Sequence, residues 1–183
     1  MQIKTLRSET VYHGKAFDVR RELIRLPGGK QTWLDIVDHP GAVTLVPVDS
    51  QGLVYFVRQY RHSIGGEILE LPAGTLDANE EPEICALREV REEIGMSASQ
   101  LEKLGEFFLA PGYSTEYMYV FLATGLEPNP LPGDEDEILQ VVTLRPARAF
   151  ELIAEGKIRD AKTLAALYLA QPHLGKTAGS DQG

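Results

Sequence analysis

The sequence has little cysteine and no long hydrophobic run. Cys85 is the single cysteine among 183 residues, so an internal disulfide is excluded, and we expect this residue to be a small buried member of a helix. No apolar stretch approaches the roughly 20 residues that span a bilayer. The N-terminal "MQIKTLRSETVYHG" also lacks the hydrophobic segment of a signal peptide. These absences predict a soluble, cytoplasmic protein without a membrane partner.

Positive charge is also scarce. The chain has 18 Lys and Arg against 27 Asp and Glu, a formal net charge of −9, which argues against the basic face that a nucleic-acid partner needs. A small anionic ligand remains compatible with this charge, because bound divalent cations can bring a phosphate to acidic residues. The sequence contains no GxSxG motif or reactive-cysteine setting. The four histidines lack the spacing of metal ligands: His13, His39, His62 and His173.

The first seventy residues have the pattern of β-strands. The alternating "FDVRRELIRL" stops at the turn signal "PGGK", which leads into "QTWLDIV". Two apolar, β-branched segments follow, "GAVTLVPV" and "GLVYFVRQY", separated by the turn residues "DSQG". This arrangement predicts antiparallel hairpins.

Helices and further strands are expected in the rest of the chain. One helix is predicted to open at Glu81-Pro82, where proline suits the first turn, and to stop at Gly95. The segments "LEKLGEFFL", "YMYVFLAT" and "ILQVVTL" have strand patterns, and "PARAFELIAEG" and "DAKTLAALYLA" have helical ones. This order predicts an α+β fold, an α/β/α sandwich of antiparallel and mixed strands.

The length of the chain bounds its domain organisation. A chain of 183 residues fits one domain with a small appendage. We predict an N-terminal β-strand region at residues 1–40, a main domain at residues 41–172 and a flexible tail at residues 173–183. The sequence contains no internal repeat and no long linker between these parts.

Seven carboxylates are concentrated in "GTLDANEEPEICALREVREEIGM", residues 74–96. Glu89 and Glu93 are four residues apart and Glu92 is three beyond Glu89, so a helix would place these carboxylates on one face. A solvated charged face is one interpretation. The other is a cation site, because clustered like charges repel unless cations occupy them, and oxygen ligands favour Mg²⁺ or Mn²⁺. The opposite face is predicted to be buried through Leu87, Val90 and Ile94.

The spacing of this segment separates the two interpretations. Five residues lie between Gly74 and Glu80, and seven more precede "REVREEIGM". The segment resembles at every fixed position the signature of the Nudix hydrolases, which is Gly, five residues, Glu, seven residues, then Arg-Glu-apolar-x-Glu-Glu-x-Gly-apolar. The flanking "RQYR…LELPAG" and "APGYSTE" are also similar to the family, so the resemblance extends over most of the chain. It implies a Nudix-type sandwich with a mixed sheet and an N-terminal antiparallel β-sheet extension.

The resemblance also implies which residues bind divalent metal. Glu89 and Glu93 would be the main ligands, and Glu92 would ligate the metal or support the other two during catalysis. The backbone carbonyl of Ala73 is implied as a further ligand. Two side chains would orient the carboxylates, as metal sites require: Glu80 and Arg88. The other charged residues of the segment are expected to be solvated: Asp77, Glu81, Glu83 and Arg91.

Motifs that flank this segment narrow the choice of substrate. Pro111, fifteen residues beyond Met96, is followed by glycine and resembles the mark of the ADP-ribose pyrophosphatase branch, although such a dipeptide alone would be a turn. "VRQYR" and "ELPAG" resemble the same branch and imply Arg61, together with Arg58, as phosphate contacts, because a guanidinium fork suits phosphate oxygens. Glu116 in "GYSTE" is implied either to contact the terminal ribose or to have a structural role.

Two further features acquire roles through this resemblance. The acidic loop "GDEDEIL" would supply Glu135 as general base and Glu137 as metal support, or the two in reversed roles. Trp33, the single tryptophan, would stack on adenine while Asp35 reads the base edge, both from the partner subunit of a homodimer. Packing in a core or an interface is the alternative for this tryptophan.

The implied function is hydrolysis of a small nucleoside diphosphate sugar. We expect a Mg²⁺-dependent pyrophosphatase, with Mn²⁺ able to replace Mg²⁺, that converts ADP-ribose to AMP and ribose 5-phosphate. The alternative substrates are another nucleoside diphosphate sugar and a dinucleotide such as FAD. A catalytically silent Nudix domain that senses ADP-ribose is the alternative from another functional class, but the complete glutamate set favours the enzyme.

Overall fold

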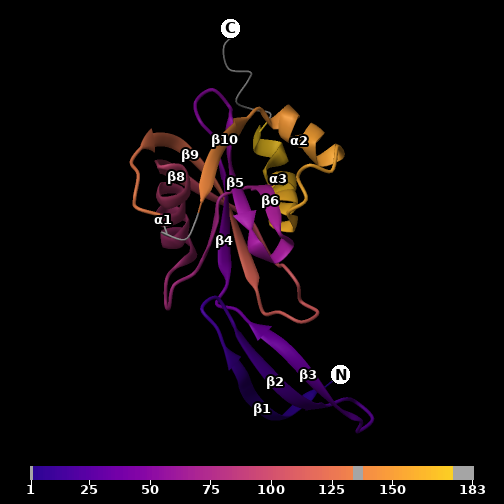
Figure 1. Cartoon of the computed structure of the whole chain (residues 1–183). Coiled ribbons are helices and arrows are strands. Elements are labelled where there is room, and N and C mark those ends of the chain that lie inside the picture. Colours follow the sequence, from indigo (N-terminus) through magenta and orange to yellow (C-terminus); the bar gives the residue numbers. More distant parts are fainter. Residues whose placement is uncertain (1, 134–137, 175–183) are drawn as a thin grey trace. The chain divides into compact units, whose positions relative to one another are not determined.

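The computed structural model describes residues 2–133 and 138–174 (Figure 1). Their contacts divide the chain into two compact units. Unit 1 consists of Met1–Gly41 and Phe107–Met118, and unit 2 consists of Ala42–Glu106 and Tyr119–Gly183. Within the described residues, every helix belongs to unit 2, whereas unit 1 is built from strands and loops.

Unit 1 contains an antiparallel sheet with the strand order β1-β2-β3. Its strands are β1 (Lys4–His13), β2 (Asp18–Arg25) and β3 (Gln31–Asp38). Between β2 and β3 the chain turns at Gly28 and Gly29, whose φ angles of 91° and 89° favour glycine because it lacks a Cβ atom. The hairpin predicted around "PGGK" is therefore confirmed.

The second segment of unit 1 is a loop attached to β3 by backbone hydrogen bonds. The N–H of Val37 donates to the carbonyl of Tyr113 at 2.8 Å, and the N–H of Thr115 donates to the carbonyl of Val37 at 2.9 Å. The hydroxyl of Thr115 also accepts the N–H of His39 at 2.9 Å. These bonds fix the "GYSTE" segment to the N-terminal sheet.

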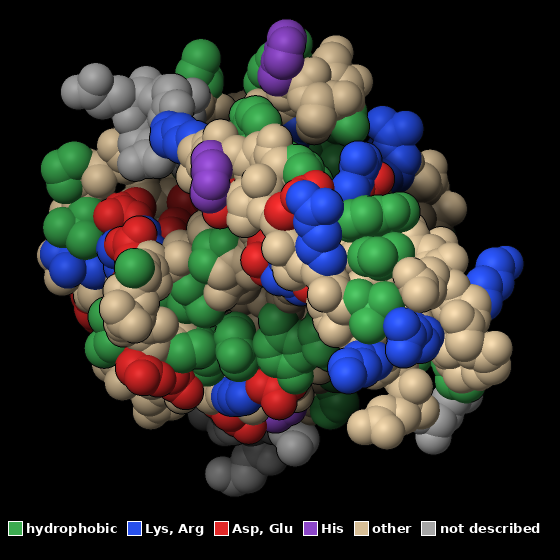
Figure 2. Space-filling model, turned by 90° about the horizontal axis from the view of Figure 1, so that it is seen from below, with side chains coloured by type: hydrophobic (Ala, Val, Ile, Leu, Met, Phe, Trp, Pro, Cys, Tyr) green, Lys and Arg blue, Asp and Glu red, His purple; other side chains and the backbone are tan. Residues whose placement is uncertain are grey.

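Several large hydrophobic side chains of unit 1 are exposed to solvent. Val11 is 50% exposed, Trp33 45% and Leu34 43%, whereas Ile24 of β2 is buried. Figure 2 shows hydrophobic side chains among acidic and basic ones on the face of the molecule that is seen from below. Trp33 and Leu34 are neighbours on β3, so their side chains are exposed on opposite faces of the sheet.

Unit 2 is built on two sheets, with the strand orders β7-β4-β9-β8 and β10-β5-β6. The segments "GAVTLVPV" and "GLVYFVRQY" form β4 and β5, which are inner strands of the two sheets, and the strands predicted there are confirmed. The first sheet consists of β7 (Ala73–Thr75), β4 (Ala42–Pro47) and most of β9 (Tyr117–Pro128) and β8 (Met96–Phe108). The second consists of β10 (Leu139–Leu144), β5 (Val54–Arg61) and β6 (Gly66–Glu70), paired antiparallel.

Helices cover both sides of these sheets. Figure 1 shows α1 (Pro82–Ile94) on one side, and α2 (Pro146–Ala154) with α3 (Ala161–Leu174) on the other. Both α1 and α2 begin with proline, which lacks the N–H that the first turn of a helix leaves unpaired. The predicted α+β fold and α/β/α sandwich are confirmed. In the described part of the chain, no helix has the length and apolar character that crossing a membrane requires.

The C-terminal helix is longer than the segment that predicted it. The pattern "DAKTLAALYLA" ends at Ala170, but α3 continues to Leu174. The side chain of Leu174 is buried, which accounts for the added turn. The proposed start of the tail, at residue 173, therefore falls within the last turn of α3.

The core of unit 2 holds α1 against the sheets. Val43 and Leu45 of β4, Val57 of β5 and Val90 of α1 are almost completely buried in one cluster. Burial of each Val or Leu side chain contributes about 1.5–3 kcal/mol. Because β7 pairs with β4 and is followed by α1, this core also fixes the position of the acidic segment.

Candidate functional site

Helix α1 carries the acidic segment, and two of its carboxylates face inward. Glu89 and Glu93 are 8% and 7% exposed, and Val90 and Ile94 are buried with them. The predicted burial of Val90 and Ile94 is confirmed, whereas Leu87 is only half-buried. The prediction that the carboxylates lie on the opposite, exposed face is wrong for Glu89 and Glu93. A helix turns by roughly 100° per residue, so positions 89 and 93 adjoin positions 86 and 90, on the side that packs against β7.

Strand β7 fits closely against both carboxylates. A Cβ atom at Gly74 would overlap the carboxyl group of Glu89, so only glycine leaves room for that side chain. The N–H of Ala73 donates to Oε2 of Glu93 at 3.1 Å. Packing therefore explains why the spaced motif begins with glycine: the Glu89 carboxyl occupies the space that a side chain at position 74 would take.

Arg88 connects three carboxylates. Its Nε and Nη2 donate to the two oxygens of Glu80 at 3.0 and 2.9 Å. Its Nη1 donates to Glu89 at 2.5 Å and to Glu92 at 2.9 Å. The hydrogen bonds from Arg88 lower the pKa of Glu80 to about 2, and the bond to Glu80 in turn raises the pKa of Arg88. Four residues that the sequence singled out thus form one hydrogen-bonded cluster.

Cys85 contacts this cluster from the buried side of α1. Its sulfur lies 3.3 Å from Nη2 of Arg88 and 3.6 Å from the carbonyl oxygen of Thr75. Burial raises the pKa of the thiol, so it stays protonated and unreactive near neutral pH. The prediction of a small buried helix residue is confirmed.

The donor set of α1 and β7 suits a divalent cation. Glu89 and Glu93 bring two buried carboxylates to β7, and buried charges are unfavourable unless they are paired. Carboxylate and carbonyl oxygens are the ligands that Mg²⁺ and Mn²⁺ prefer. In the ranges that the structure describes, no three His, Cys, Asp or Glu side chains are grouped to hold a metal ion, and Arg88 binds Glu89 and Glu92 instead. A bound cation would therefore share Glu89 with Arg88 or displace the guanidinium.

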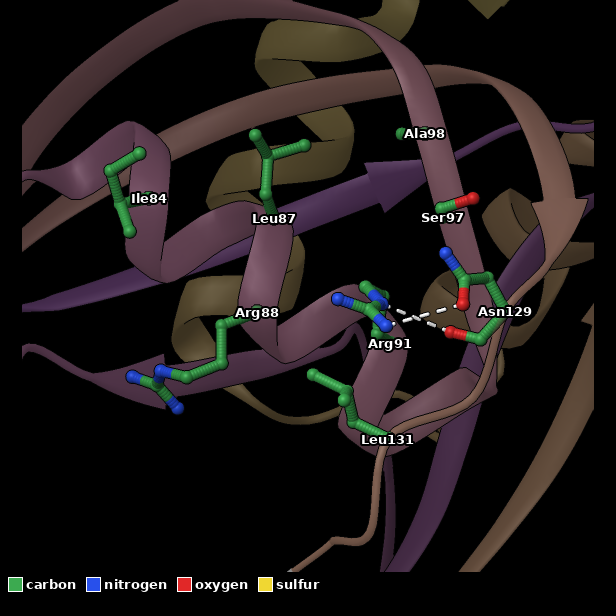
Figure 3. Close-up of a pocket in the computed structure, with 8 residues that line it drawn as sticks. All are labelled: Ile84, Leu87, Arg88, Arg91, Ser97, Ala98, Asn129 and Leu131. Carbon is green, nitrogen blue, oxygen red and sulfur yellow. Dashed lines mark hydrogen bonds between the residues drawn. The ribbon is translucent and has the colours of Figure 1, made fainter.

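The chain that follows β9 lies along the C-terminal end of α1. Arg91, which was expected to be solvated, donates from Nε to the carbonyl of Asn129 at 3.0 Å and from Nη2 to its Oδ1 at 3.2 Å. A pocket beside this contact is lined by Leu87, Leu131 and Ile84, among others (Figure 3). The N–H of Leu131 donates to the carbonyl of Arg91 at 3.2 Å. Arg91 is therefore partly exposed, and its side chain also fixes the return of the chain to the helix.

The other residues expected to be solvated are confirmed as exposed: Asp77, Glu81 and Glu83. The two predicted residues of the acidic loop, Glu135 and Glu137, lie outside the described residues. The last described residue before them is Gly133, where a Cβ atom would lie 3.4 Å from the carbonyl oxygen of Glu92. The chain thus passes Glu92 directly before this loop.

The two arginines expected to contact phosphate differ in their surroundings. Arg58 is exposed on β5. Arg61 at the end of β5 donates to both carboxylate oxygens of Glu70, from Nε at 2.8 Å and from Nη2 at 2.9 Å. Sequence reasoning missed Glu70 and its second partner, Lys162. The signal for Glu70 was a charged residue inside the apolar run "EILEL".

The residues expected to bind adenine lie on adjacent positions of one face of β3. Trp33 is partly exposed, and the guanidinium of Arg7 lies 6.0 Å from its ring centre. Arg21 donates to the two oxygens of Asp35 at 2.6 and 3.3 Å, and this hydrogen bonding lowers the pKa of Asp35. A base that bound Asp35 would therefore have to compete with Arg21.

The loop of unit 1 contains the remaining two predicted residues. Pro111 is exposed in a turn, which the N–H of Tyr113 closes on the carbonyl of Ala110 at 3.1 Å. The carbonyl of Glu116 accepts the N–H of Leu109 at 3.1 Å. The backbone of Glu116 therefore closes this loop, and its side chain is partly exposed.

A comparison with known families establishes the relationship. The family model of the NUDIX domain matches residues 38–167, a range that contains β7, α1 and every predicted metal ligand. The chain belongs to the NUDIX domain family. Two predicted substrate contacts, Trp33 and Asp35, precede the matched range of this NUDIX protein.

Relatives of this NUDIX protein match nearly its whole length. An ADP-ribose pyrophosphatase from Bacillus subtilis (strain 168) is 38% identical over 175 residues, which cover 93% of this chain and 94% of the relative. A methanol dehydrogenase activator from Bacillus methanolicus is 34% identical over 170 residues, 92% of each chain. Among solved structures, an ADP compounds hydrolase has a TM-score of 0.85 at 26% identity and covers 96% of this chain and 95% of its own. The similarity therefore includes the N-terminal sheet as well as the NUDIX domain.

Proposed function

We propose that this NUDIX protein is a divalent-metal-dependent hydrolase that cleaves ADP-ribose into AMP and ribose 5-phosphate. The observation that carries the proposal is the pair of buried carboxylates on α1, Glu89 and Glu93, held against β7. The similar proteins named as an ADP-ribose pyrophosphatase and an ADP compounds hydrolase support an adenosine diphosphate compound as substrate. The carboxylates support hydrolysis over binding alone, because a sensor does not need them.

Mg²⁺ is the metal that we propose, with Mn²⁺ able to replace it. Glu89 and Glu93 would be its main ligands, with the carbonyl of Ala73 and the carboxylate of Glu92 beside them. When bound, the metal neutralises the anionic diphosphate, acidifies a water molecule and stabilises the leaving phosphate.

Glu80 and Arg88 have an orienting role in this proposal. Glu80 binds the guanidinium of Arg88 through two parallel hydrogen bonds, which restrict its rotation. Arg88 in turn holds the carboxylates of Glu89 and Glu92. Carboxylates that are already oriented lose less conformational freedom when they bind a cation.

We assign activation of water to the acidic segment that lies outside the described residues. Glu135 would accept a proton from the attacking water as general base, and Glu137 would support the metal. The water oxygen forms a bond to one phosphorus, the bond from that phosphorus to the bridging oxygen breaks, and the bridging oxygen leaves with the other phosphate. Attack at either phosphorus gives the same products, so isotopically labelled water identifies the atom attacked.

Four further residues are proposed to contact the substrate. Arg61 and Arg58 would bind the diphosphate, because a guanidinium matches phosphate oxygens in charge and shape. The turn at Pro111 and the carboxylate of Glu116 would adjoin the terminal ribose. Arg61 has the strongest support, because Glu70 already fixes its orientation.

We also propose a homodimer in which residues 1–40 form the contact between subunits. Trp33 would stack on the adenine bound by the partner subunit, and Asp35 would exchange its bond to Arg21 for the base edge. The exposed hydrophobic side chains of unit 1 support a covered surface there. A cytoplasmic location fits the single reduced cysteine.

The test is a panel of diphosphates assayed with Mg²⁺ and ranked by kcat/KM: ADP-ribose, ADP-glucose, GDP-mannose, FAD, NADH and diadenosine polyphosphates. We expect ADP-ribose to rank first and Glu93→Gln to lower kcat by about a hundredfold or more, as loss of a metal ligand would. The matched control is Glu83→Gln, an exposed carboxylate in the first turn of the same helix, which should keep wild-type turnover. Tight binding of ADP-ribose without hydrolysis of any compound would favour a sensor.

A second experiment assigns the acidic loop. Glu135→Gln is expected to lower kcat more than Glu137→Gln at saturating Mg²⁺, because a general base acts in the chemical step. Glu137→Gln is expected to raise the Mg²⁺ concentration needed for half-maximal rate. If Glu135→Gln is silent while Glu137→Gln is inactive, the two roles are reversed.

A further inference from the structure

Four charged side chains of unit 2 form a chain of ion pairs between β5, β6 and α3, which lie side by side in Figure 1. Arg61 is the last residue of β5 and Glu70 the last of β6, while Asp160 and Lys162 stand at the start of α3. Glu70 is 2% exposed and Lys162 8%. Buried charges are unfavourable without partners, and here their signs alternate from Arg61 to Asp160.

Glu70 lies at the centre of this network. Its two oxygens accept Nε and Nη2 of Arg61 at 2.8 and 2.9 Å. Nζ of Lys162 donates to Oε2 of Glu70, and also to Oδ2 of Asp160 at 2.8 Å. Burial opposes ionisation of Glu70, but the hydrogen bonds from Arg61 and the charge of Lys162 together lower its pKa. Glu70 is therefore a carboxylate at neutral pH.

Asp160 anchors the far end of the network to the backbone. Its Oδ2 accepts the N–H of Thr163 at 3.0 Å and the Thr163 hydroxyl at 2.6 Å. The oxygen of that hydroxyl accepts the N–H of Leu71, the residue after Glu70, at 2.8 Å. The start of α3 is thus tied both to the side chain of Glu70 and to the backbone of the next residue, Leu71, so the Glu70 carboxylate has a fixed position.

Arg61 is the exposed end of the network. Its side chain is 39% exposed, whereas that of Glu70 is 3% exposed. The buried Glu70 carboxylate holds this partly exposed guanidinium through two hydrogen bonds. The orientation of the Arg61 cation is therefore fixed before an anion binds. Less rotamer entropy is then lost on binding than for an arginine that moves freely in solvent.

We propose that Glu70 is a positioning residue that presents Arg61 to the diphosphate of the substrate, with Lys162 holding Glu70 in place. The inference rests on the proposed function, in which Arg61 contacts phosphate. Glu70 does not touch the substrate in this role and acts through Arg61. A bidentate carboxylate is suited to it, because the bond fixes the plane of the guanidinium as well as its distance.

The test is a double-mutant cycle on KM and kcat for ADP-ribose. Arg61→Ala is expected to raise KM by about tenfold or more and to change kcat by less than about threefold, as loss of ground-state binding does. Glu70→Gln is expected to give a similar rise in KM in the wild-type background and no further rise in the Arg61→Ala background, because its effect passes through Arg61. If Glu70→Gln raises KM equally in both backgrounds, Glu70 acts only on the fold and the inference is overturned.

Two further variants keep the test decisive if Glu70→Gln does not fold. Arg61→Lys retains the charge but cannot form the bidentate pair of hydrogen bonds to Glu70. Its KM for ADP-ribose should therefore rise nearly as far as that of Arg61→Ala. A wild-type KM in Arg61→Lys would overturn the inference. Ala166→Gly is the matched control, because Ala166 is a buried residue of α3 outside the network, so its replacement loosens the helix without changing any of the four charged side chains. It should lower the Tm and leave KM within about twofold. A rise in KM equal to that of Glu70→Gln would mean that general loosening suffices, and would overturn the inference.

Failure of the proposed function has a different signature. If the wild-type protein hydrolyses no compound of the panel, the same cycle is measured on the Kd for ADP-ribose by titration calorimetry. Coupling between Arg61 and Glu70 in that cycle supports the positioning role in a protein that binds without hydrolysis. Additive effects on Kd overturn the role independently of catalysis.

Discussion

Gly74 is the residue whose replacement tests the geometry of the carboxylate pair most directly. The methyl group added in Gly74→Ala would overlap the carboxyl of Glu89, which would have to leave its place against β7. We expect kcat for ADP-ribose to fall by about a hundredfold, since displacement of a catalytic group by about 1 Å has effects of this size. Gly66→Ala is the control, because its added Cβ atom meets nothing within 4 Å. Wild-type kcat in Gly74→Ala would contradict the proposed role of Glu89.

Glu80 gives the stability of the protein a predictable pH dependence. Its pKa in the folded state is about 2, below the ordinary 4.5, so the ionised carboxylate stabilises the fold above about pH 4.5. That contribution is lost as the pH falls from about 4.5 towards 2. In Glu80→Gln, we expect the loss in unfolding free energy between about pH 7 and pH 3 to be smaller than in the wild type by about 1–2 kcal/mol.

The measurement for Glu80 is urea unfolding of the metal-free protein at both pH values. Glu83→Gln serves as the control, because Glu83 is exposed on the same helix and is not among the carboxylates that Arg88 binds. Its pH dependence should match that of the wild type. An equal loss of stability in Glu80→Gln and the wild type would contradict the assignment.

Residues close in the sequence were predictable, and residues brought together by the sheet were not. Arg88 and Glu92 are four residues apart, a spacing that makes them neighbours on one helix face, so this pair was predictable from the sequence. The partner of Arg61 is nine residues away on the next strand, and Lys162 is 92 residues from Glu70. Such contacts depend on the register of β5 with β6 and on the position of α3, which local pattern does not determine.

At the scale of elements, α1 departs from the usual pattern of a surface helix. The rule that charged residues face solvent and apolar residues face the core predicted a buried face formed by Leu87, Val90 and Ile94. In the structure Glu89 and Glu93 are buried beside Val90 and Ile94, because β7 supplies a glycine and a backbone N–H at that place. Departures from local rules are expected where function competes with stability.

Helix α1 should therefore be stabilised by metal. Two buried carboxylates repel each other, and a divalent cation that binds both favours the folded state by mass action, by about 2.7 kcal/mol at a hundredfold excess over its Kd. We expect the Tm to rise by several degrees when excess Mg²⁺ is added to protein treated with a chelator. The measurement is differential scanning calorimetry.

Variants of the same helix provide the comparison for this thermal shift. Glu93→Gln should lose most of the rise in Tm, because one proposed ligand becomes neutral. Glu83→Gln should keep it, since Glu83 is exposed in the first turn. A full thermal shift in Glu93→Gln would show that Mg²⁺ binds elsewhere.

At the scale of the whole molecule, the fold class and most elements were predictable because alternation, turn residues and helix ends are local signals. The division of the chain into two compact units was less predictable from the sequence. Residues 107–118 belong with the N-terminal sheet, since Val37 pairs with Tyr113 and Thr115 across a long separation in the sequence. Periodicity within one segment carries no information about such pairing.

The proposed homodimer is tested with Trp33. Trp33→Ala should raise KM for ADP-ribose by about tenfold, because one stacked aromatic contact contributes about 1–3 kcal/mol, and it should weaken dimerisation. Sedimentation velocity measures the oligomeric state, and steady-state kinetics measures KM. Tyr168→Ala is the control, because Tyr168 is an exposed aromatic residue of α3 in unit 2. Unchanged KM and an unchanged dimer in Trp33→Ala would refute the stacking role.

Because Trp33 is the single tryptophan, the two units of this chain can be followed by two independent spectroscopic signals. The single tryptophan lies in unit 1, so intrinsic fluorescence reports on the N-terminal sheet. The described helices all lie in unit 2, so far-ultraviolet circular dichroism at the helical band reports on the NUDIX domain. Coincident denaturation curves from the two signals would mean that the units unfold as one cooperative system, and separated curves would give each unit its own transition.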